Sequence, residues 1–167
     1  MNTRAEKIGF IGLGRMGRPM AINLIKQGFD LLVHDVNPGA VATVVAAGSN
    51  ARANTGTNAG TAVAASIAGI AKQCGIIVTM LPSSVEVEAV CTGPDGLFAH
   101  AQKGTVLMDM STIDPLATDR LNAAASAHGM TMADAPVGRL AEHADRAESL
   151  FMIGASDADF KIGRAHV

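Results

Sequence analysis

The 167-residue sequence has no tryptophan and no tyrosine, and aromatic residues make up only 3% of it. A core must therefore be built from Ala, Val, Ile, Leu and Met, and a hydrophobic fraction of 49% supplies these residues in ordinary amount. A chain of this length can bury a sizeable core as one domain.

A large excess of charge of one sign is also lacking, because the formal net charge is −2. Without a basic excess, nucleic-acid binding through phosphate neutralisation is not expected. No apolar run approaches the roughly 18 residues that span a membrane, and the N-terminus is too polar for a signal peptide. We expect a cytoplasmic protein that contacts neither nucleic acid nor membrane.

Cys74 and Cys91 are the only cysteines, and they do not form a Cys-x-x-Cys pair. This pattern argues against a zinc site and against a disulfide scaffold. The five histidines are scattered without metal-ligand spacing. We therefore expect no metal ion, and a reduced compartment.

Short apolar segments alternate with segments of helical pattern. Strands are expected at 7–11, 31–35, 75–81, 106–110, 130–134 and 150–153, and helices at 16–27, 38–48, 84–90 and 115–128. The stretch 49–62 is rich in Asn, Thr, Gly and Ala, and is expected to be a loop before a weak helix. This alternation predicts an α/β fold: a doubly wound, mostly parallel Rossmann-type sheet with helices on both faces.

Gly12, Gly14 and Gly17 form a G-x-G-x-x-G pattern between the first expected strand and helix. In dinucleotide-binding turns the first glycine allows a tight turn, the second admits a pyrophosphate, and the third lets helix and strand pack closely. The helix N-terminus then favours the phosphates.

A carboxylate is expected about 20 residues further on, where it binds the adenosine ribose. Asp35 ends the second expected strand, 21 residues after Gly14. Its charge would repel a 2′-phosphate, so the sequence favours NAD over NADP, although Arg15 could offset that preference. The alternative is a structural glycine turn followed by a solvated aspartate.

Four stretches together resemble the β-hydroxyacid dehydrogenases, the 3-hydroxyisobutyrate dehydrogenase family: GFIGLGRMGRPMAINL, VTMLPSS, DMSTIDP and DAPVGR. Their order and spacing are similar to the family's N-terminal domain, so residues 1–160 are assigned as a dinucleotide-binding domain. The resemblance implies hydride transfer between nicotinamide and a small β-hydroxyacid or semialdehyde acid. Methylmalonate semialdehyde, tartronate semialdehyde, succinate semialdehyde and sulfolactaldehyde all remain candidate substrates.

The resemblance also implies site residues. The implied cofactor contacts are Gly12, Gly14, Arg15, Met16, Gly17, Asp35, Leu81, Pro82 and Thr112, with Arg15 and Met16 beside the pyrophosphate. Ser111 resembles a contact to the substrate anion. The alternative for Ser111 and Thr112 is a helix cap ahead of Asp114-Pro115.

Gly138-Arg139-Leu140 stands where the family usually has Ser-Gly-Gly. An arginine adds a forked set of donors suited to carboxylate, sulfonate or phosphate. A V-G-R sequence at this place resembles that of family members similar to sulfolactaldehyde reductase. We therefore expect Gly138 and Arg139 to contact a small anionic hydroxyacid or aldehyde. The alternative is a surface arginine paired with Glu142 or Asp145.

Two further departures concern length. The 45 residues from Asp35 to Met80 exceed the family's usual spacing, and the surplus at 49–65 is expected to be a flexible or helical excursion without a catalytic role. Family members are nearly twice as long, and their second, helical half carries the proton-donating lysine and the oligomer interface. Lys161 lacks the Gly-x-x-Gly-x-x-x-Lys setting of that lysine. We expect no catalytic residue in this chain, an inactive fragment, and a homo-oligomeric parent.

Residues 161–167 are interpreted as a non-native tail. One back-translation of IGRAHV matches a widely used sequencing adapter, which would make the tail a read-through of the insert end. The alternative is a genuine short tail. The functional alternatives are a non-catalytic NAD-binding module, a sulfolactaldehyde reductase-like enzyme, and a doubly wound domain that binds no nucleotide.

Overall fold

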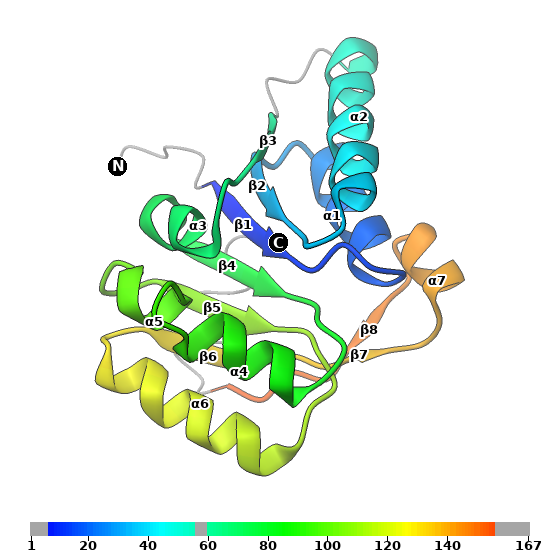
Figure 1. The fold of residues 1–167 in the computed structure, drawn as a ribbon. Coiled ribbons are helices and arrows are strands. Elements are labelled where there is room, and N and C mark those ends of the chain that lie inside the picture. Colours follow the sequence, from blue (N-terminus) through cyan, green and yellow to red (C-terminus); the bar gives the residue numbers. More distant parts are fainter. Residues whose placement is uncertain (1–6, 56–59, 156–167) are drawn as a thin grey trace, which may run out of the picture.

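The computed structural model describes residues 7–55 and 60–155 (Figure 1). The expected tail at 161–167 and part of the expected 49–65 excursion lie outside these residues. The elements, in chain order, are β1 (Ile8–Ile11), α1 (Gly17–Lys26), β2 (Leu31–His34), α2 (Pro38–Thr55), β3 (Thr61–Val63), α3 (Ile67–Gln73), β4 (Ile76–Thr79), α4 (Ser84–Thr92), α5 (Leu97–His100), β5 (Val106–Asp109), α6 (Pro115–Ala127), β6 (Thr131–Asp134), β7 (Val137–Gly138), α7 (Ala141–Asp145) and β8 (Leu150–Phe151).

Six strands form one parallel sheet in the order β3-β2-β1-β4-β5-β6. The central strand β1 pairs with β2 on one side and with β4 on the other, so that Ile8 aligns with Leu31 and with Ile76. The residues of β1 are buried on both faces, which is why it reads as a continuous apolar run. The expected doubly wound, parallel Rossmann-type sheet is confirmed.

Helices cover both faces of the sheet (Figure 1). On one face α3, α4, α5 and α6 pack around a core that includes Ile70, Leu107 and Leu121. On the other face α1, α2 and α7 pack around Phe10, Ile25 and Val33. No helix within 7–55 and 60–155 is both long enough and apolar enough to span a membrane.

The expected end of the second helix at Gly48 is wrong, because α2 continues to Thr55. A Cβ at position 48 would collide with the side chain of Thr61 on β3. Gly48 therefore serves close packing between α2 and the edge strand rather than helix termination. This helix and β3 also replace part of the loop expected at 49–62.

The strand expected at 150–153 does not join the main sheet. It is shortened to β8, which pairs antiparallel with β7 in a separate two-stranded ribbon. No sequence pattern predicted β7 and α7, because their segments are too short to show a period. The Nδ2 atom of Asn23 on α1 donates to the Ala144 carbonyl of α7 at 2.6 Å, which anchors this segment beside α1.

The packing role of Gly48 predicts the sign of two helical glycine substitutions. Gly48→Ala should lower the melting temperature, because the added methyl meets the Thr61 side chain. Gly69→Ala on α3 makes only an ordinary contact, 3.5 Å from Ser66 Oγ, and should raise stability by up to about 1 kcal/mol through helix propensity. Urea unfolding of both variants compares them. A stabilised Gly48→Ala would contradict the packing role.

Candidate functional site

A cavity of about 610 Å³ opens at the carboxyl ends of β1 and β4. The strand order reverses between these two strands, and open α/β sheets bind ligands at such a point. Of the sequence-predicted site residues it is lined by Gly12, Gly14, Arg15, Met16, Gly17, Asp35, Leu81 and Pro82. Eight of the nine expected cofactor contacts therefore lie around one cavity, and Thr112 is the one outside its lining.

The three glycines have different surroundings. Gly12 has a φ of +96°, and a Cβ there would collide with the Met80 carbonyl oxygen, so this position brings β1 and β4 together. A Cβ on Gly17 would collide with the Gly12 carbonyl oxygen. A Cβ on Gly14 would meet nothing within 4 Å. Tight turn and close packing thus account for two glycines, and open space remains beside the third.

Asp35 is bound to the glycine turn itself. Its Oδ2 accepts the Leu13 N–H at 2.5 Å, and its Oδ1 accepts the Asn37 N–H at 2.7 Å. These two bonds fix the carboxylate at the rim of the cavity. Each oxygen still has a second lone pair, so the carboxylate can also accept a hydroxyl of a bound ligand.

The cavity's other wall follows β4. Ser83 caps α4 by accepting the Val85 N–H at 3.2 Å, and its hydroxyl donates to Glu86 Oε2 at 2.5 Å. This hydrogen bond lowers the pKa of Glu86, which lines the cavity. The Ser-x-x-Glu spacing is a capping-box signal that could have identified Glu86. His34 and Val36 also line the cavity and were missed, although they flank Asp35 in sequence.

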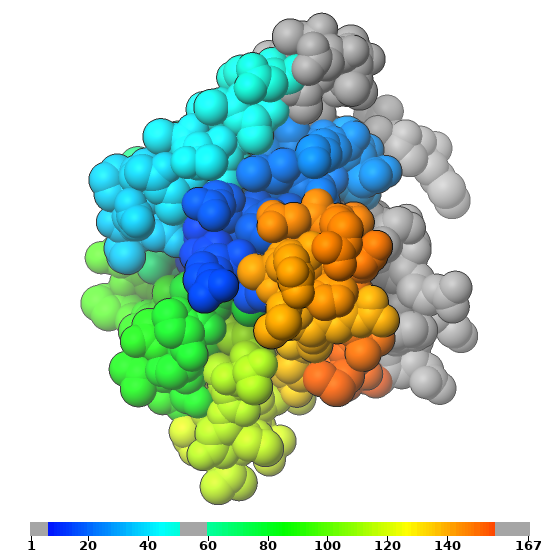
Figure 2. Space-filling model, turned by 90° about the vertical axis from the view of Figure 1, so that its right-hand side faces the viewer, coloured from blue at the N-terminus to red at the C-terminus, as the bar shows by residue number. Residues whose placement is uncertain are grey.

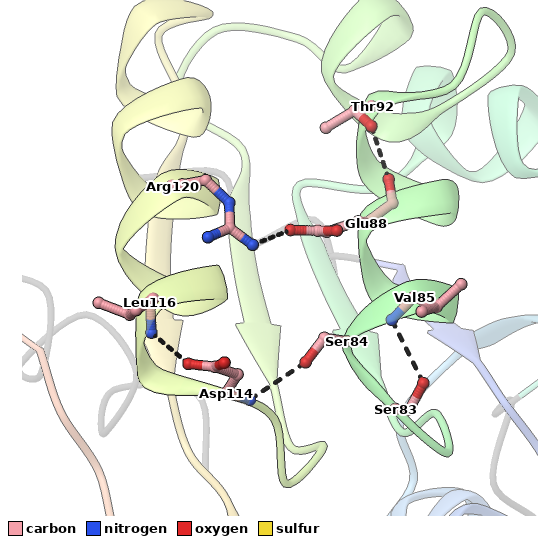
Figure 3. A network of polar contacts seen from close by, with 8 residues as sticks. All are labelled: Ser83, Ser84, Val85, Glu88, Thr92, Asp114, Leu116 and Arg120. Carbon is pink, nitrogen blue, oxygen red and sulfur yellow. Dashed lines mark hydrogen bonds and ion pairs between the residues drawn. The ribbon is translucent and has the colours of Figure 1, made fainter.

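Helices α4 and α6, which follow β4 and β5, are bound to each other (Figure 3). Asp114 caps α6 by accepting the Leu116 N–H at 2.8 Å, and its own N–H donates to Ser84 Oγ at 3.1 Å. Arg120 pairs with Glu88 at 2.7 Å. The helix cap is therefore Asp114 and not Ser111 or Thr112.

Ser111 is fully buried, and its Oγ accepts the Leu81 N–H at 2.9 Å. Thr112 is exposed. Neither residue lines the 610 Å³ cavity. The structure thus places Ser111 behind the cavity wall, where it supports Leu81.

A second cavity of about 510 Å³ adjoins the first and shares Arg15 and Met16 with it. Its other lining residues are Arg139, Leu140, Ala141 and Glu142. Figure 2 shows the segment with α7, in orange, beside the glycine turn, in blue. The two arginines, 124 positions apart in sequence, therefore face one hollow.

Arg139 has a φ of 72°, a left-handed conformation that favours glycine. Its Nη1 donates to the Glu148 carbonyl oxygen at 3.1 Å, and no ion pair with Glu142 or Asp145 is present among the described residues. Gly138 does not line the second cavity but pairs with Leu150 in the ribbon.

Neither cysteine belongs to a reactive site. Both thiols are free and buried, and burial raises the pKa of Cys74 to about 11 and that of Cys91 to about 12. Both therefore stay protonated at neutral pH. Within the described ranges, no group of three His, Cys, Asp or Glu side chains is arranged to hold a metal ion.

Comparisons with known proteins identify the family of this chain. The family model of the NAD binding domain of 6-phosphogluconate dehydrogenase matches residues 7–165. A probable mitochondrial 3-hydroxyisobutyrate dehydrogenase from Dictyostelium discoideum is 38% identical over 168 residues, covering 100% of this chain and 49% of that protein. The 3-sulfolactaldehyde reductase of Escherichia coli is 41% identical over 147 residues, covering 88% of this chain and 45% of the relative.

The solved structure of Mycobacterium tuberculosis 3-hydroxyisobutyrate dehydrogenase with L-serine matches with a TM-score of 0.84 at 30% identity. The match covers 96% of this chain and 50% of that one. This chain spans about half the length of the curated relatives it matches. The resemblance seen in the sequence is confirmed: the chain belongs to the family of the NAD-binding domain of 6-phosphogluconate dehydrogenase, as found in 3-hydroxyisobutyrate dehydrogenases.

Proposed function

We propose that this chain is the cofactor-binding half of an NAD-dependent β-hydroxyacid dehydrogenase. The observation that carries the proposal is the 610 Å³ cavity, where the glycine turn and Asp35 meet the end of β4. The family match supports the same assignment. When bound, NAD supplies the hydride acceptor, and its reduced form the donor, for a small hydroxyacid or semialdehyde.

The described residues fit a dinucleotide. Gly14 has open space beside it just before the first residue of α1, where the positive end of the helix dipole favours a phosphate. Arg15 lines both cavities and adds a positive charge for the pyrophosphate. Leu81 and Pro82 form an apolar wall that excludes water from one side.

Asp35 supports NAD over NADP. Its carboxylate is fixed by the Leu13 and Asn37 N–H groups and cannot turn away from an incoming 2′-phosphate. Repulsion between the two negative charges would weaken NADP binding. A ribose 2′-hydroxyl, by contrast, can donate to the same carboxylate.

Reduction of a carbonyl also needs a proton donor at its oxygen. None of the lysines in the described part of the chain lines either cavity. We propose that the donor comes from a second half such as that which lengthens the relatives, and that this half also mediates oligomer formation. Alone, the chain would bind cofactor without turnover.

Arg139 supports a small substrate with an anionic tail. Arg139 lines the same cavity as Arg15, where two positive charges would favour a carboxylate or a sulfonate. The similarity to 3-sulfolactaldehyde reductase favours a sulfonate as a second candidate. A substrate held there would lie next to the cofactor, because Arg15 and Met16 line both cavities.

A glycine pair tests the cofactor site. Gly14→Ala should keep the melting temperature of the wild type, since the methyl meets no protein atom, yet weaken NAD binding more than tenfold because it occupies the pyrophosphate space. Gly17→Ala should destabilise the fold itself. Isothermal titration calorimetry suits a chain without tryptophan, and Gly69→Ala is the control. Unchanged NAD affinity in Gly14→Ala would exclude this placement of the pyrophosphate.

Asp35→Ala tests the cofactor preference. The wild type should bind NAD more tightly than NADP, and the variant should narrow that ratio about tenfold, because one repulsion and one ribose contact are lost together. Asp119→Ala, which removes an exposed carboxylate on α6, is the matched control. A ratio that stays constant in Asp35→Ala would show that this carboxylate does not set the preference.

Arg139→Gly tests the anion site with 2-hydroxyethanesulfonate as the probe, in the presence of NAD. The variant should lose most of its affinity for the probe while gaining up to about 1 kcal/mol of stability, because glycine relieves the left-handed backbone. Arg146→Ala, which removes a surface arginine paired with Glu148, should bind the probe like the wild type. Equal losses in the two variants would indicate a nonspecific charge effect.

A further inference from the structure

Buried side chains extend the pairing of β4 and β5 beyond the last residues of the two strands. Thr79 and Asp109 are the last aligned pair of these strands, and Thr79 Oγ1 donates to Asp109 Oδ1 at 2.8 Å. Two residues beyond this pair in each segment, the Leu81 N–H donates to Ser111 Oγ at 2.9 Å. The side chains of Thr79, Asp109 and Ser111 are all fully buried.

Asp109 lies at the centre of this arrangement. Its Oδ1 accepts a second bond, from the Ser111 N–H at 3.1 Å, while its buried Oδ2 has no partner among the described residues. Within residues 7–55 and 60–155, Thr79 and Ser111 provide the hydrogen bonds that orient the carboxyl group. Burial raises the pKa of Asp109, although the hydrogen bonds from Ser111 and Thr79 oppose that rise.

We propose that Asp109 is a positioning residue for the cofactor cavity, which acts on Leu81 through Ser111. With Thr79 it holds the Ser111 backbone, and the Ser111 hydroxyl in turn fixes the Leu81 N–H. Leu81 lines the 610 Å³ cavity and packs close to Gly12. The cavity wall is thus set by a relay of three buried residues, Thr79, Asp109 and Ser111, that do not themselves line the cavity.

The relay explains an otherwise costly choice of residues. A fully buried carboxyl with one oxygen unpartnered destabilises a fold, and an apolar residue would pack at lower cost. The other oxygen, Oδ1, however, accepts one hydrogen bond from Thr79 on β4 and another from Ser111 in the loop after β5. The last backbone hydrogen bond between these two segments runs from the Met110 N–H to the Thr79 carbonyl at 2.8 Å, and beyond it the Ser111 side chain continues the contact to Leu81.

Four single variants and the double variant Thr79→Val/Ser111→Ala test the relay in the 167-residue chain. Thr79→Val keeps the shape of the side chain and removes the donor to Asp109, while Thr79→Ser keeps the hydroxyl. Ser111→Ala removes the acceptor for Leu81. Thr105→Val is the matched control. Thr105 lies immediately before β5, is 2% exposed, and its Oγ1 has no partner in the described structure.

Two readouts separate this proposal from the proposed function on which it rests. Hydrogen exchange of the Leu81 amide, followed by NMR without ligand, reports the position of the wall directly. The NAD dissociation constant reports its consequence for binding. Global unfolding in urea identifies any variant whose amide exchange rises only through lower overall stability.

Thr79→Val should speed Leu81 exchange and weaken NAD binding about three- to tenfold, the range of one hydrogen bond, and Ser111→Ala should do so at least as strongly. The double variant should match Ser111→Ala, because both changes act along one path. Thr79→Ser and Thr105→Val should stay within about twofold of the wild type.

Independent, multiplying effects of Thr79→Val and Ser111→Ala would overturn the relay. So would normal Leu81 exchange in Thr79→Val, or a Thr79→Ser variant as impaired as Thr79→Val. If the wild type fails to bind NAD, the proposed function fails, while the exchange measurement still decides whether the relay positions Leu81.

Discussion

The cavity depends on how closely the turn after β1 approaches the end of β4. Gly12 adopts a left-handed conformation against the Met80 carbonyl, where no side chain fits. On either side of this contact the ladder is intact: the Gly12 N–H donates to His34 at 3.0 Å and the Met80 N–H to Ile11 at 2.9 Å. Three strands are held together at this point, and residues that follow each of them line the cavity.

The end of the described chain brings a second arginine, Arg139, to the side of the sheet where the cavity opens. The ribbon of β7 and β8 and the short helix α7 fold back on α1, where Asn23 binds the Ala144 carbonyl. This return places Arg139 in a cavity shared with Arg15. A chain segment that follows the last strand of the sheet thereby reaches the glycine turn at its centre (Figures 1 and 2).

Much of this architecture was predictable because it rests on local signals. Buried parallel strands are apolar on both faces, and the glycine turn and Asp35 have characteristic spacing. The end of α2 was mispredicted because Gly48 is required by a tertiary contact with Thr61, which no local pattern encodes. The burial of Ser111 was unpredictable for the same reason: its partner, Leu81, lies 30 residues away on the neighbouring strand's loop.

The central claim is that the crevice between β1 and β4 binds a dinucleotide, and NMR titration of the ¹⁵N-labelled chain with NAD tests it most directly. The account predicts saturable shifts of the amides of Gly12, Gly14, Val36 and Leu81, which surround the 610 Å³ cavity. Amides of α5, at the opposite end of the sheet's strands, should stay unchanged. A folded chain whose spectrum does not respond to millimolar NAD, or responds only around α5, would contradict the account.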